Sequence, residues 1–140
     1  RKAMNYPIPK DAKIISINSD YSQSGNYNNL EGLHIVTDKG DIKILISDGQ
    51  CCCEDAGSKF LETPDNIEKF IGSTILKIED ICVGLTAAED DYGFDAGGET
   101  QLKVTTTKGV LQYAVYNSHN GYYSHATFVQ VFDKIEEDYL

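Results

Sequence analysis

The sequence has few basic side chains and no long apolar run. Its 140 residues include 12 Lys and Arg against 22 Asp and Glu, so the formal net charge is −10. Contacts with phosphates need Lys and Arg, so this balance argues against direct nucleic-acid binding and against docking on an anionic membrane. No apolar stretch is long enough to cross a bilayer, and the N-terminus lacks the apolar core of a signal peptide. We therefore expect a cytoplasmic protein.

The motifs that usually carry catalysis are missing as well. There is no phosphate-binding glycine loop, no Gly-x-Ser-x-Gly and no His-Glu-x-x-His. Gly93, Gly97 and Gly98 lie in an acidic segment, where carboxylates would repel a phosphate group. We predict that the protein is not an enzyme and needs no cofactor.

The cysteines do not form a recognisable framework. Three of the four are consecutive, Cys51, Cys52 and Cys53, whereas secreted proteins spread their cysteines along the chain, so we expect reduced thiols. We read these three as small, partly buried residues at a strand-to-loop junction. With His119 and His125 they are ligand types that suit zinc, although no paired half-site is present. A metal site of these five residues, or a nucleophilic thiol with one of the histidines as base, is an alternative.

Hydrophobic alternation predicts mainly strands. Ile42, Ile44 and Ile46 alternate with polar residues, and the short polar turn 38–41 joins them to the preceding run as an antiparallel hairpin. A second hairpin turns at Lys108-Gly109. The predicted β-rich runs are 14–17, 33–37, 42–46, 75–83, 102–107, 110–116 and 122–132.

One stretch is typical of a helix. Thr63-Pro64-Asp65-Asn66 offers an N-cap, the stripe of Ile67, Phe70 and Ile71 has helical spacing, and Gly72 ends it. The fold class we expect is α+β, a mostly antiparallel sheet of about seven strands with this one short helix packed on it. Residues 1–140 form a single domain in this reading, with an ordered core over 12–132 and an acidic C-terminal tail, 133–140, that frays.

The residues we predict to bind a partner are acids and tyrosines. The segments 20–29 and 86–99 are expected as long loops, and the second holds the densest acidic cluster. Carboxylates there could meet a basic protein surface, and tyrosines are enriched at interfaces. The plainer interpretation is a solvated loop and ordinary strand tyrosines. The predicted partner-binding residues are Glu89, Asp90, Asp91, Tyr92, Asp95, Glu99, Tyr122 and Tyr123.

Three short motifs carry a resemblance to a known family. They are Cys52-Cys53-Glu54, Lys69-Phe70-Ile71-Gly72 and Asn120-Gly121-Tyr122-Tyr123-Ser124. In this order they resemble a small domain family of unknown function that is encoded in bacteriophage and prophage genomes. The resemblance spans residues 14–131. It implies a phage setting, in the cytoplasm of a bacterial host cell, and no established activity.

This setting favours an accessory protein that interferes with host machinery. The first hypothesis is an anti-CRISPR-like inhibitor of a bacterial defence system, in which the acidic, tyrosine-rich surface binds stoichiometrically to a basic host protein such as a CRISPR effector. A second hypothesis is a protein that binds or sequesters a nucleotide signal, across a homo-oligomer interface. A Cys-based metal-binding protein is the third.

Overall fold

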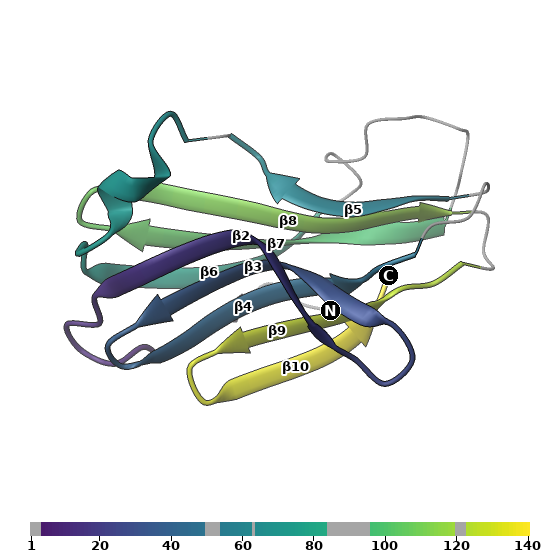
Figure 1. The fold of residues 1–140 in the computed structure, drawn as a ribbon, viewed down its shortest axis with the longest axis horizontal. Helices are drawn as coiled ribbons and strands as arrows, with labels where there is room; N and C mark the ends of the chain where they lie inside the picture. Colours follow the sequence, from purple (N-terminus) through teal and green to yellow (C-terminus); the bar gives the residue numbers. More distant parts are fainter. Residues whose placement is uncertain (1–3, 50–53, 63, 84–95, 120–122) are drawn as a thin grey trace.

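The chain folds into two antiparallel sheets that face each other (Figure 1). A computed structural model describes residues 4–49, 54–62, 64–83, 96–119 and 123–140, and these stretches contain ten strands. The first sheet has the order β1-β6-β7-β8-β5, with bounds Met4–Asn5, Ile75–Val83, Ala96–Thr106, Gly109–His119 and Glu54–Phe60. The second sheet has the order β10-β9-β4-β3-β2, with bounds Lys134–Tyr139, Ala126–Val131, Gly40–Ser47, Asn29–Thr37 and Ile14–Ser24.

The α+β expectation is therefore wrong, and the predicted helix shows why. Where the sequence predicted a helix, the described chain forms one 3-10 turn, Ile67–Phe70. The side chain of Asn66 caps this turn by accepting a hydrogen bond from the Glu68 amide. The backbone leaves the turn at Ile71, which is extended, and only Phe70 is buried. A short 3-10 turn of this kind connects strands and places Phe70 in the core, and it adds no helical layer to the fold. No described helix is long and apolar enough to cross a membrane.

The acidic C-terminal tail is a strand. Lys134–Tyr139 form β10, which pairs with β9 from Lys134 opposite Val131 to Tyr139 opposite Ala126. Pairing satisfies the backbone along one side of β10, while the acidic residues Glu137 and Asp138 remain exposed to water. The sequence predicted a fraying tail from its charge, and the structure places this segment in an edge strand paired with β9. The expected loop 20–29 is likewise mostly strand, and its turn is confined to residues 25–28.

The predicted alternation in the centre of the second sheet is confirmed. Ile42, Ile44 and Ile46 of β4 are buried, and the β3–β4 hairpin closes with Thr37 opposite Gly40. The inner faces of both sheets meet in one apolar cluster. Its largest fully buried members are Ile14, Leu33, Ile35, Ile42, Ile44, Ile46, Ile78, Leu102, Val104, Leu111 and Val115. Polar groups are therefore found mainly where this interior ends.

Candidate functional site

The structure describes only two of the predicted partner-binding residues. Glu89, Asp90, Asp91, Tyr92, Asp95 and Tyr122 lie outside the described residues. Glu99 is buried on β7, where its carboxylate accepts a hydrogen bond from Gln101, so it does not present its charge to solvent. Tyr123 is half-buried, and its backbone carbonyl accepts from the Asn117 side chain at 2.7 Å.

Both histidines of the metal alternative lie at one end of the sandwich. His119 ends β8 and is paired in register with Glu54, the first residue of β5. His125 lies just before β9, and its Nε2 is 2.7 Å from Glu54 Oε2. Among the described residues, no group of three His, Cys, Asp or Glu could hold a metal ion. Cys51, Cys52 and Cys53 fall outside that part of the chain, so this alternative stays a prediction.

The contact between His125 and Glu54 joins the two sheets. The two side chains are only 7% and 3% exposed. On its other side, His125 Nδ1 lies 2.8 Å from the Ser47 carbonyl oxygen and 3.1 Å from Ser47 Oγ. The Ser47 carbonyl can only accept a hydrogen bond, so Nδ1 carries a proton and has no lone pair for the Ser47 hydroxyl proton. In this arrangement His125 does not activate the Ser47 hydroxyl group.

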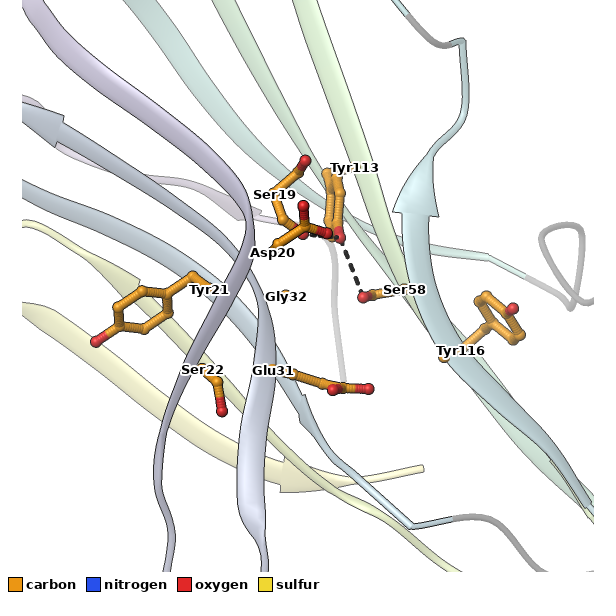
Figure 2. A pocket seen from close by; sticks show the side chains of 10 residues that line it. Ser19, Asp20, Tyr21, Ser22, Glu31, Gly32, Ser58, Tyr113 and Tyr116 are labelled. Carbon is orange, nitrogen blue, oxygen red and sulfur yellow. Dashed lines mark hydrogen bonds between the residues drawn. The ribbon is translucent and has the colours of Figure 1, made fainter.

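A cleft opens on another margin of the sandwich, between the edge strands of the two sheets. Its volume is about 390 Å³, and β2 and β3 of the second sheet face β5 and β8 of the first across it. Figure 2 shows these side chains. The lining residues are Ser19, Asp20, Tyr21, Ser22, Glu31, Gly32, Gly57, Ser58, Tyr113 and Tyr116.

A local irregularity of β2 shapes the first wall of the cleft. The register of β2 against β3 shifts between Asn18 and Tyr21, and the Asp20 amide donates instead to Asn18 Oδ1 at 2.9 Å. Such a bulge redirects the side chains that it contains. Opposite Tyr21, Gly32 has a φ of +152°, and a Cβ there would run into the Ile44 backbone. The bulge and the glycine together set where Ser19 and Asp20 lie.

Tyr113 forms the floor of the cleft. The buried side chain comes from β8, and its hydroxyl is 3.0 Å from Ser58 Oγ and 3.4 Å from the Ser19 carbonyl oxygen (Figure 2). The ring packs edge-on against Phe60, with centroids 4.9 Å apart. This hydroxyl therefore connects strands of both sheets at the base of the opening.

The cleft is acidic. Burial raises the pKa of Tyr113; the hydrogen bond with Ser58 lowers it, and the nearby charges of Asp20 and Glu31 raise it further. Both carboxylates are on exposed residues of the second sheet, and none of the described lining residues is Lys, Arg or His. In Figure 2, Glu31 points across the opening towards the first sheet, whereas the ring of Tyr21 points away from it. The cleft thus offers hydrogen-bond acceptors and negative charge.

Sequence reasoning missed this cleft for a simple reason. Asp20 and Tyr113 are far apart in the chain and meet only because β2 and β8 occupy facing sheets. Asp20 was expected in a loop, and Tyr113 was one of several strand tyrosines. The nearest local signal is the run Asn18-Ser19-Asp20, three polar residues that interrupt the alternation of β2.

Comparison with known proteins finds a matching family. A family model described as a domain of unknown function, DUF7448, matches residues 11–129. That range includes every residue that lines the cleft as well as Glu54 and His125, and it leaves β10 outside. No curated protein and no solved structure matches the chain.

Replacing His125 by leucine should strongly destabilise the protein. The change removes the hydrogen bond between His125 Nε2 and the buried Glu54 carboxyl group, and losing the partner of a buried polar group costs about 1–3 kcal/mol. His34→Leu is the matched control, because His34 lies 3.6 Å from a partly exposed Asp41, and that pair contributes about 1 kcal/mol or less. Urea unfolding of both variants measures the two losses. Equal losses would contradict the structural importance of the contact between His125 and Glu54.

Tyr113 should make the protein less stable in alkali. Its pKa is raised in the folded state, so the unfolded chain loses the phenolic proton first once the pH passes about 10. This contribution to stability is complete below that pH and is lost as the pH rises towards the folded-state pKa. The free energy of unfolding, measured in urea from about pH 9 to 11, should fall less steeply for Tyr113→Phe than for the wild type. Tyr27→Phe, at an exposed tyrosine, should follow the wild type; a parallel fall for Tyr113→Phe would refute the assignment.

Proposed function

The chain belongs to this domain family of unknown function, and we propose that it is a non-enzymatic binding protein whose cleft between the sheets receives a cationic side chain of a partner protein. The observation that carries the proposal is the chemistry of the lining. Asp20 and Glu31 contribute negative charge, and Ser58, Tyr113 and the Ser19 carbonyl contribute acceptors. No described lining residue supplies a compensating cation.

The acceptors suit the donors of Arg and Lys. A guanidinium group has five N–H donors and an ammonium group three, and neither accepts a hydrogen bond. A volume of about 390 Å³ lies at the small end of ligand-binding clefts and is large enough to admit one long side chain. The net charge of −10 adds long-range attraction, which raises the rate of encounter with a basic surface and weakens with salt.

The cleft alone does not explain tight binding. An ion pair that remains in contact with water contributes about 0.2–1 kcal/mol, and both Asp20 and Glu31 are exposed. The cleft would therefore select for a cation at one position, while the surrounding surface contributes most of the buried area.

The anti-CRISPR-like hypothesis is a more specific form of this proposal. In that form the partner is a CRISPR effector or another defence protein in the cytoplasm of a bacterial host, and the captured cation belongs to a surface that otherwise holds nucleic acid. Its support is the acidic charge and the resemblance to a phage-encoded family. The nucleotide-signal alternative fits the cleft less well, since two carboxylates would repel phosphates.

Affinity capture with paired charge variants tests the proposal. The full chain is immobilised and exposed to a low-salt bacterial lysate, and the captured proteins are then titrated individually. Asp20→Asn/Glu31→Gln should weaken their binding about 2- to 30-fold, as expected for the loss of two exposed ion pairs. The control Glu62→Gln/Asp65→Asn makes the same change in net charge at two exposed acids outside the cleft.

Two results would contradict the proposal. One is a cleft variant that binds every captured protein as tightly as the wild type does. The other is an equal loss in the control variant, which would assign the binding to net charge rather than to the cleft.

A further inference from the structure

A second hollow lies on the outer face of the second sheet. In the sheet, β2 and β10 are opposite edges, yet residues from the tip of the β2–β3 hairpin line the same trough as residues of β9 and β10. Figure 1 shows the tip bending across the ends of β9 and β10. The trough has a volume of about 600 Å³.

The trough has an apolar floor and an aromatic rim. Leu30, Ala126 and Phe128 line it and are half-buried. Tyr27 and Tyr139 also line it, and they are 96% and 70% exposed. Large, exposed tyrosines beside an apolar hollow are typical of protein interfaces, because they bury much area with little loss of side-chain entropy.

The side of the trough formed by β10 is acidic. Glu137 and Asp138 line it, and no described lining residue is Lys, Arg or His, although the Lys43 ammonium group donates to the side chain of Gln23, another lining residue. Strand β10 is the last strand of its sheet, and most of its side chains are exposed. A segment that fills this trough would therefore need apolar side chains for the floor and positive charge for the wall.

We propose that the trough is a docking site for an extended basic segment of a partner protein, with an apolar side chain next to Lys or Arg. This is a second contact surface, on a different face from the cleft. Charge complementarity favours such a segment over a second copy of this chain. The chain carries a net charge of −10, and two acidic troughs would repel each other.

An NMR titration of the full chain with synthetic peptides tests this site. The probe is the acetylated, amidated peptide Arg-Leu-Arg-Leu-Arg, and the controls are Glu-Leu-Glu-Leu-Glu and Arg-Ser-Arg-Ser-Arg. We expect the probe to shift the amide signals of residues 24–30, 126–128 and 137–139. The two controls should bind at least about fivefold more weakly, because each lacks either the charge or the apolar side chains.

Matched variants locate the contact. Tyr27→Ser/Tyr139→Ser should weaken binding of the probe about fivefold or more. Ile135→Ser is the control, since Ile135 is a 55% exposed apolar residue of the same strand that does not line the trough. Asp20→Asn/Glu31→Gln should leave this binding unchanged, so failure of the cleft proposal and failure of this one are distinguishable.

Several outcomes would overturn the docking site. They are shifts confined to the cleft, equal binding of all three peptides, a double tyrosine variant that binds like the wild type, and concentration-dependent shifts at the trough without peptide. The last would identify a second copy of the chain as the occupant.

Discussion

The packing of two sheets through one apolar interior is the constraint on which the other features depend. Isoleucines of β4 meet leucine and valine side chains of β7 and β8, and this contact excludes unpaired charge from the middle of the molecule. Charged and polar groups collect at its margins. At one end His125 and Glu54 join the sheets, and along another margin the acidic cleft opens between strands of both sheets.

The same packing gives the cleft its chemistry. Asp20 and Glu31 come from the second sheet, whereas Ser58 and Tyr113 come from the first, so the packing of the sheets brings carboxylates and hydroxyl groups to the same cleft. The Tyr113 hydroxyl contacts Ser58 in its own sheet and the Ser19 carbonyl in the other. A cation that enters this space meets hydroxyl and carbonyl oxygens that are already held in place, which lowers the entropic cost of binding.

Part of the fold can be read from the sequence, and the rest depends on contacts that no local pattern encodes. The β3–β4 hairpin follows from strict alternation around a polar turn. Strand β5, Glu54–Phe60, has no such alternation, and its place comes from pairing with β8. Strand β10 is too acidic to suggest a strand, and it forms because β9 offers an open edge. Glu54 and His125 lie in or beside motifs that the sequence singled out, but their contact needed the structure.

The central claim is that the cleft between the sheets recognises a cation. The most direct measurement is an NMR titration of the full chain with acetyl-arginine amide, with the neutral acetyl-glutamine amide as reference. We expect that only the arginine probe shifts the signals of Ser19, Asp20, Glu31, Ser58 and Tyr113, and that Asp20→Asn/Glu31→Gln reduces these shifts at the same probe concentration. Equal shifts with both probes, or undiminished shifts in the double variant, would contradict the proposal.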